Sequence, residues 1–136
     1  MIKTICYISD SHSRESSKSL ASLFEKAKHN NTVNNITGFL IHSNYNFLQV
    51  LEGEATIVDN VFKKISKDSR HKNIFNVIDT IINQRVFEDY NFGFTIVNNP
   101  SELDRLFEYL EWLKTADDIL ANKVISIVES FILRKQ

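Results

Sequence analysis

The stretch NFLQVLEG, residues 46 to 53, carries apolar side chains on both faces of a predicted β-strand. Side chains alternate along a strand, so Gln49 shares a face with Phe47 and Leu51, while Leu48 and Val50 point the other way. A buried amide without hydrogen-bond partners costs about 1–3 kcal/mol. The sequence therefore requires a polar partner for Gln49 inside an apolar setting.

Composition limits the classes of protein to consider. The chain has 136 residues, 43% of them hydrophobic, which fits one compact domain with a real core. Its net charge of -1 argues against the broad positive surface of a nucleic-acid-binding protein. No apolar run approaches the roughly 20 residues of a membrane-spanning helix, and the N-terminal run is too short for a signal peptide. We expect a soluble protein, and the lone Cys6 favours the reducing cytoplasm.

The hydrophobic periodicity predicts seven elements in the order β-α-β-β-α-β-β. Turn-forming asparagines in SNYN, residues 43–46, predict a hairpin, and EDYN supplies a later turn. The order indicates an α+β, ferredoxin-like fold, in which two helices cover one face of a five-stranded mixed sheet. Strands are expected at residues 2–9, 35–43, 46–53, 74–87 and 91–97. The first helix is expected to carry an apolar stripe and to end near HNN at residues 29–31; the stripe is Leu20, Leu23, Phe24 and Ala27. The second helix is expected to end within residues 67–73; its stripe is Val58, Val61, Phe62 and Ile65.

The last third of the chain predicts two further helices. Ser101 and Asp104 resemble a capping box behind Pro100, and Thr115, with Asp118 three residues on, is expected to start the second helix. Covering the free face of the sheet and pairing with a second chain are both open roles for these helices. Their apolar stripes are Leu103, Leu106, Phe107, Leu110 and Leu120, Val124, Ile127, Val128, Phe131.

Several common sites are excluded by the residue inventory. The three glycines, Gly38, Gly53 and Gly93, allow neither a P-loop nor a glycine-rich dinucleotide turn. The abundant serines lack a Gly-x-Ser-x-Gly elbow, so a hydrolase has little support. The four histidines show no ligand-like pairing, and we expect no metal site.

Polar residues on apolar elements remain as candidates. Tyr7 lies in the first predicted strand, Gln49 in the third, and Asn30 with Asn31 at the end of the first helix. In one interpretation they are structural: Tyr7 is a core aromatic bonded to Gln49, and the asparagines cap the helix. In the other, neighbouring strands bring the phenol and the amide together as a polar notch in the sheet.

Four segments carry a family resemblance by their order and spacing: ICYISDS, NNTVNNITGFLIHSNYNFLQVLEGE, ISKDSRHKNI and RVFEDYNFGF. On these segments, from the first strand to about Phe94, the chain resembles the BLUF family of blue-light receptors, which bind flavin in a ferredoxin-like domain. The resemblance implies a flavin-binding sensor domain at residues 1–97 and a C-terminal helical extension at residues 98–136.

The resemblance also implies roles for particular residues. Tyr7 matches the photoactive tyrosine of the family, and Gln49 matches the glutamine between that tyrosine and the flavin. Asn31 matches the asparagine on the polar edge of the ring, and Asn30 precedes it. The remaining flavin contacts implied are the apolar walls Leu23 and Ile65 and the polar residues Lys64, Asp68, Arg70 and His71. The flavin is FAD or FMN, bound non-covalently.

The implied mechanism is a rearrangement of hydrogen bonds. Light excitation of the flavin draws an electron and a proton from Tyr7 through Gln49, and their return leaves the amide rotated or tautomerised. The resulting shift of absorption to longer wavelength decays in darkness. In the last strand, where the family commonly shows tryptophan and methionine, this chain has Tyr90 and Phe92. This departure leaves the signal route through these two residues in question.

The output is expected to be a protein contact. About forty residues after Phe94 are too few for an enzyme domain, so no enzyme activity is expected. Trp112 is a candidate anchor for association, as a homo-oligomer or with an unidentified downstream protein. The alternative is a flavin-free, ferredoxin-like regulatory domain that binds a small metabolite.

Overall fold

The computed structural model of this chain describes residues 1–11, 17–68, 71–88 and 93–134. The described residues form nine elements, and their order confirms the predicted β-α-β-β-α-β-β plan followed by two helices. The elements are β1 (Ile2–Ser11), α1 (Ser17–Val33), β2 (Thr37–Ser43), β3 (Asn46–Glu54), α2 (Ala55–Ser66), β4 (His71–Ile82), β5 (Phe94–Val97), α3 (Pro100–Lys114) and α4 (Ile119–Arg134).

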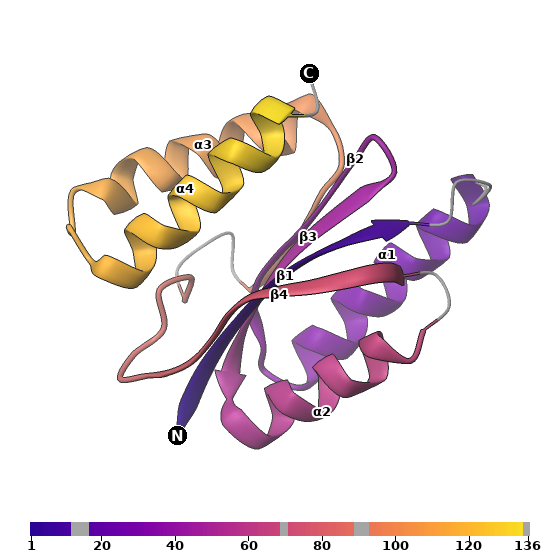
Figure 1. Cartoon of the computed structure of the whole chain (residues 1–136), viewed down its shortest axis with the longest axis horizontal. Coiled ribbons are helices and arrows are strands. Elements are labelled where there is room, and N and C mark those ends of the chain that lie inside the picture. The colour runs from indigo at the N-terminus through magenta and orange to yellow at the C-terminus, as the bar shows by residue number, and fades with distance from the viewer. Residues whose placement is uncertain (12–16, 69–70, 89–92, 135–136) are drawn as a thin grey trace.

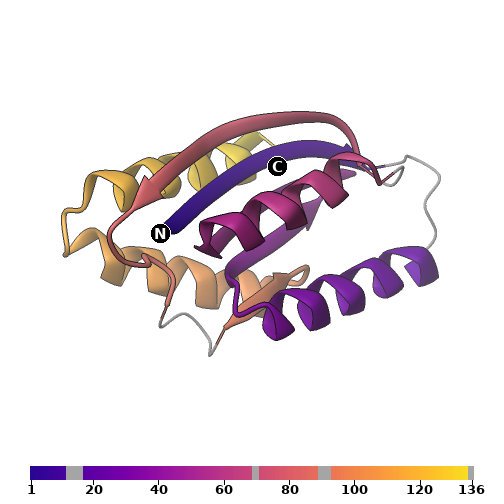
Figure 2. The same cartoon turned by 90° about the horizontal axis from the view of Figure 1, so that it is seen from below.

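The five strands form one sheet in the order β4-β1-β3-β2-β5. β3 pairs antiparallel with β1 and β2, and β4 pairs antiparallel with β1, whereas β5 runs parallel to β2. The sheet is therefore mixed, as predicted for an α+β, ferredoxin-like fold. Figure 1 shows it nearly edge-on, with α1 and α2 on one face and α3 and α4 on the other. Figure 2 shows the same three layers from the side of α1 and α2.

β3 is the central strand and is buried on both faces. All residues from Phe47 to Gly53 are buried. Phe47 and Leu51 join the core under α1 and α2, while Leu48 and Val50 join the core under α3 and α4. The two-faced apolar pattern of this strand is thus explained by a helical layer on each side of the sheet.

A two-residue turn fixes the register between β2 and β3. Asn44 and Tyr45 both have positive φ angles, 47° and 64°, as the tight hairpin turn requires. The register places Leu40 opposite Gln49. Further along β2, Gly38 has φ +129°, and a Cβ there would lie 2.0 Å from the carbonyl oxygen of Val50. Only glycine allows the two backbones to approach this closely.

The two C-terminal helices cover the second face of the sheet. Leu106 and Leu110 of α3 and Val124 and Val128 of α4 are buried in the same core cluster as Cys6 of β1. Of the two roles left open by the sequence, the structure therefore shows the covering role. Large apolar side chains of these helices nevertheless remain exposed to solvent, namely Trp112, Ile119 and Leu133.

The predicted starts of both C-terminal helices are wrong. The N-cap of α3 is Asn99, whose Oδ1 accepts a hydrogen bond from the Glu102 amide at 2.9 Å, so Ser101 already lies inside the helix. Thr115 ends α3 rather than starting α4. α4 begins at Ile119, and the carboxylate of Asp118 accepts from the Ala121 amide at 2.8 Å. In both cases a neighbouring Asn or Asp provides a cap, as such residues commonly do.

Other boundaries also differ from the prediction, most of all in α1, β4 and β5. α1 continues to Val33, so Asn30 and Asn31 lie within its last turn and do not cap it. β4 ends at Ile82 instead of continuing to Phe87, because the amides of Val86 and Phe87 bond to the side chain of Glu52 instead of a strand. β5 begins at Phe94, and most of the predicted EDYN turn lies outside the described residues.

Replacing the observed cap of α3 tests this assignment. We expect Asn99→Ala to lower the free energy of unfolding by about 1 kcal/mol, because the Glu102 amide loses its acceptor. Ser101→Ala is the matched control, and its effect should stay within about 0.5 kcal/mol. Urea unfolding followed by circular dichroism measures both. A larger loss for Ser101→Ala than for Asn99→Ala would restore the capping box predicted from the sequence.

Candidate functional site

A cavity of about 290 Å³ lies between α1, α2 and the sheet. Its walls combine apolar, amide and charged side chains, which is the usual make-up of a small-molecule site. The apolar residues are Leu23, Ala27, Leu40, Val61 and Ile65; the amides are Asn30, Asn31, Asn34 and Gln49; the charged residues are Lys26, Lys64 and Asp68.

The Gln49 amide, which lines this cavity, is bonded to a buried phenol. Tyr7 of β1 lies directly opposite Gln49 of β3 in the antiparallel register, and Gln49 Nε2 donates a short hydrogen bond to Tyr7 Oη. Both side chains are buried, and the Tyr7 ring packs on Phe62 of α2 with centroids 5.5 Å apart. Burial raises the pKa of Tyr7 well above its usual value, an effect that the bond from Gln49 opposes in part. The phenol therefore keeps its proton at neutral pH.

The other polar atom of the Gln49 amide, Oε1, is an unused hydrogen-bond acceptor. Gln49 Oε1 is buried and has no hydrogen-bond partner among the described residues. An unsatisfied buried carbonyl of this kind is costly, and a bound ligand or an ordered water can satisfy it. Since Gln49 also lines the cavity, the amide bonds Tyr7 through one end and offers its other end to a ligand.

The amides of α1 lie on one helical face that borders the cavity. Asn31 is buried, with its backbone carbonyl accepting from the Ile36 amide at 2.8 Å, whereas Asn30 and Asn34 are more accessible. The side chain of Asn34 donates to the carbonyl of Asn30 at 2.8 Å, which steadies the last turn of the helix. The buried Asn31 side chain is thus held at the cavity wall with both a donor and an acceptor.

Charged groups lie towards the solvent side of the cavity. Lys26 of α1 and Lys64 of α2 are exposed, and Asp68 follows the end of α2 and is half-buried. The negative charge of Asp68 also contributes to the raised pKa of Tyr7, after the larger effect of burial. Two lysines against one aspartate leave this part of the wall with a local positive charge, which suits an anionic group such as a phosphate.

The structure brings together seven of the nine flavin contacts predicted from the sequence: Leu23, Asn30, Asn31, Gln49, Lys64, Ile65 and Asp68. Arg70, Tyr90 and Phe92 lie outside the described residues, and of His71 only the backbone, at the start of β4, is described.

Sequence reasoning missed five of the lining residues, although signals for them existed. Lys26, Ala27 and Asn34 continue the face of α1 that Leu23 and Asn31 define, at helical spacings of three and four. Val61 belongs to the apolar stripe of α2. Leu40 follows from the hairpin register, since a two-residue turn at positions 44 and 45 places it opposite Gln49.

The residues present fit an isoalloxazine ring. Such a ring has an apolar body, which the five apolar wall residues match, and a polar edge of carbonyls and nitrogens, which amides match because each offers a donor and an acceptor. The unpartnered Gln49 Oε1 is an acceptor that a donor on the polar edge of such a ring can satisfy.

A protein-family model described as "BLUF: Sensors of blue-light using FAD" matches residues 2–93 of the chain. The chain belongs to the BLUF family. The resemblance seen in the sequence is thereby confirmed, and with it a flavin cofactor and the function of a blue-light receptor. The match ends beside β5, which agrees with the extent of the resemblance judged from the sequence motifs.

The similarity to related proteins extends over different shares of this chain and of theirs. The alpha subunit of the photoactivated adenylate cyclase of Euglena gracilis is 37% identical over 84 residues, which are 62% of this chain and 8% of that protein. A bacterial light-regulated adenylyl cyclase superposes with a TM-score of 0.68, 27% identity, 98% of this chain and 35% of the other. BlsA in its photo-activated state gives a TM-score of 0.67 and 25% identity over 92% and 91% of the two chains. This BLUF chain thus spans only a small part of the cyclases it resembles.

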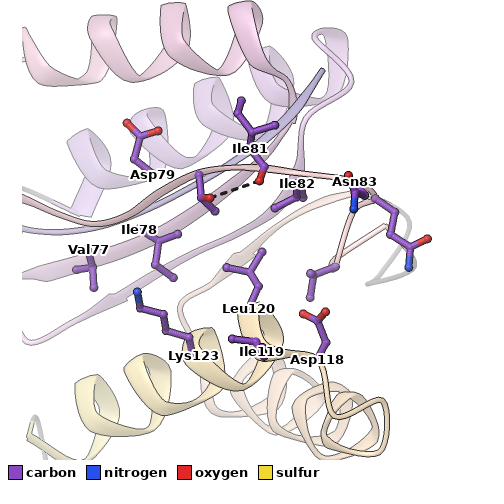
Figure 3. Close-up of a pocket in the computed structure, with 13 residues that line it drawn as sticks. Val77, Ile78, Asp79, Ile81, Ile82, Asn83, Asp118, Ile119, Leu120 and Lys123 are labelled. Carbon is purple, nitrogen blue, oxygen red and sulfur yellow. Dashed lines mark hydrogen bonds between the residues drawn. The ribbon is translucent and has the colours of Figure 1, made fainter.

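A larger cavity, of about 880 Å³, lies elsewhere, and none of the described residues predicted to contact flavin lines it. Figure 3 shows it between β4 and α4, with Leu120 and Lys123 extending from α4 towards Ile78 of β4. Ile78 belongs to the core under α3 and α4, on the opposite face of the sheet from Tyr7. Within the described ranges, no group of three or more potential metal ligands gathers, and no helix is long and apolar enough to cross a membrane.

The raised pKa of Tyr7 predicts an unusual titration. In folded protein, Tyr7 should stay protonated above pH ~10, the normal value for tyrosine, so wild type and Tyr7→Phe should give the same tyrosinate absorbance. In denaturant, all four phenols of wild type should titrate, against three in the variant, because Tyr7 is then exposed. Because the folded pKa exceeds the unfolded one, Tyr7 stabilises the fold below pH ~10, and this contribution is lost as the pH rises further. If native wild type titrated one phenol more than native Tyr7→Phe near pH ~10, the assignment of a raised pKa to Tyr7 would be contradicted.

Proposed function

We propose that Tyr7 and Gln49 are the photoactive pair of this BLUF sensor, and that the cavity between α1 and α2 holds the flavin ring. The observation that carries this proposal is the buried Gln49 amide, bonded to Tyr7 through Nε2 and unpartnered at Oε1. In this assignment Asn31 and Asn30 hold the polar edge of the ring, and Leu23 and Ile65 supply apolar walls.

The amide works as a two-position switch. Bound flavin supplies the absorption of blue light and an acceptor for an electron. Tyr7 holds a proton on Oη, and Gln49 Nε2 now donates to that oxygen. If the amide turns over, Oε1 accepts from the Tyr7 hydroxyl, and Nε2 takes the position that Oε1 had. Either arrangement gives the phenol oxygen a hydrogen bond to the amide, and a carboxylate, which only accepts, would not offer this choice.

The charged rim of the cavity orients the phosphate end of the flavin. Lys64 and Lys26 lie at the wall, and Arg70 and His71 follow in the sequence after Asp68. In this proposal their positive charges attract the phosphate, while Asp68 bonds the polar chain of the flavin. The description of the family names FAD, and FMN shares the same ring and the phosphate next to it.

The output of the sensor, in this proposal, is a change in protein association without enzyme activity of its own. Trp112 is 59% exposed on α3, and Ile119 and Leu133 are exposed at the two ends of α4, so these apolar side chains are accessible to a partner. We propose a light-dependent homo-oligomer or a contact with a downstream protein, in the cytoplasm. Tyr90 and Phe92 remain the predicted relay in the last strand.

Two substitutions test the photoactive pair. After reconstitution with FAD, wild type should be yellow and show a reversible red shift under blue light. Tyr7→Phe and Gln49→Leu should each bind flavin and lose that shift, because one partner of the switch is absent. Tyr45→Phe, at the exposed hairpin turn, is the matched control and should behave as wild type. A normal photocycle in either site variant would refute the assignment, and a colourless reconstituted wild type would favour the flavin-free alternative.

Association is tested on the full chain, because the tail helices form part of the core and their removal would expose the sheet. Sedimentation velocity in darkness and under blue light should show a change of mass in wild type. Trp112→Ala should reduce that change, since it removes the large exposed aromatic of α3, while its red shift stays normal. Equal masses in darkness and light for wild type would count against self-association and leave a downstream protein as the partner.

A further inference from the structure

A carboxylate lies in the interior of the sheet on the face opposite to the flavin site. Glu52 of β3 is fully buried, three residues beyond Gln49, and strand alternation points it towards α3 and α4. Three donors bond its carboxylate: Thr4 Oγ1 at 2.8 Å, the Val86 amide at 3.0 Å and the Phe87 amide at 2.8 Å. A buried charge is retained only with such bonds, so these contacts hold the segment 86–87 firmly to β3.

The same segment is bonded to α3 on its other side. The hydroxyl of Tyr109 donates to the carbonyl of Val86 at 2.8 Å. The ring of Phe87 is fully buried, and its centroid lies 5.1 Å from that of Phe39 and 5.9 Å from that of Tyr109. Backbone and side chain of this short segment are thus fixed between β3 and α3.

The contacts continue to the surface. The rings of Tyr109 and Trp112 lie one turn apart on α3 with centroids 5.5 Å apart, and Trp112 is exposed. A continuous series of bonds and ring contacts therefore joins the strand that carries Gln49 to the solvent side of α3. It passes through Glu52, segment 86–87 and Tyr109, and it does not require residues 90 and 92.

We propose that Glu52 is a positioning residue for signalling, which couples a displacement of β3 at Gln49 to α3 through segment 86–87 and Tyr109. The proposal rests on the proposed function, because it takes the Gln49 amide as the origin of the change. Coupling between two sites requires an element whose position both sites influence. Segment 86–87 is such an element in this proposal, because it is bonded to β3 through Glu52 and to α3 through Tyr109. Both backbone amides donate to Oε1 of Glu52, whereas Thr4 donates to Oε2, which also lies 3.2 Å from the Val86 amide nitrogen. An amide at position 52 would remove the acceptor at Oε2 and the negative charge, so the bonds that hold segment 86–87 would weaken.

The experiment uses the full chain with bound FAD and measures two signals. The flavin band reports the photochemistry at Gln49. Trp112 is the only tryptophan of the chain, so its fluorescence, light minus dark, reports α3. Amide hydrogen exchange of α3 in darkness and light gives a second readout that does not depend on the flavin spectrum. The variants are Glu52→Gln and Tyr109→Phe. Their matched controls are the exposed Glu108→Gln and Tyr45→Phe.

We expect both variants to keep the red shift and to lose most of the light-induced change in Trp112 fluorescence and in α3 exchange, with both controls like wild type.

Wild-type α3 signals in both variants would overturn the proposal, as would a normal wild-type red shift without any change in α3. Loss of the red shift in Glu52→Gln would place Glu52 in the photochemistry and also overturn it. If Glu52→Gln fails to fold, Tyr109→Phe decides, because it removes a single hydroxyl. A wild type without a red shift would instead refute the proposed function itself.

Discussion

The burial of β3 on both faces is the constraint on which the rest of this structure depends. A central strand with seven consecutive buried residues needs a helical layer on each side, and α1 with α2 and α3 with α4 supply the two layers. Each layer brings its own core, and each core approaches β3 from one side. The cavity proposed to hold the flavin and the tail helices therefore lie on opposite faces of one sheet.

β3 carries two buried polar side chains that differ in how they are bonded. Gln49 keeps one of its two polar atoms unpartnered among the described residues, whereas three donors bond the carboxylate of Glu52. A side chain with an unused hydrogen-bonding atom can exchange partners with a small loss of hydrogen bonds. A side chain whose hydrogen bonds are all made loses several of them when it is displaced. The strand thus offers a group that can rearrange on the flavin side and a fixed attachment on the tail side.

Much of this fold could be predicted from hydrophobic periodicity, because the apolar residues of each helix face one core at helical spacing, and those of the inner strands alternate between two cores. The flavin contacts predicted on α1 and α2 came from the family motifs, and those that the structure describes with side chains line one cavity. The boundary errors have specific causes. The end of β4 depends on Glu52, more than thirty positions earlier in the chain, and no local pattern reveals such a bond. The helix starts were missed because several adjacent residues can cap, and backbone geometry selects Asn99 and Asp118 among them.

The sharing of α3 and α4 between the core and the surface has a consequence for how such a receptor can change over evolutionary time. One half of each helix, represented by Leu110 and Val128, is buried against the sheet and tolerates few substitutions without loss of the fold. The solvent half, where Trp112 and Ile119 lie, can vary without loss of the fold. A new partner can therefore be acquired by changing a narrow strip of side chains, while the light-absorbing machinery beneath it stays the same.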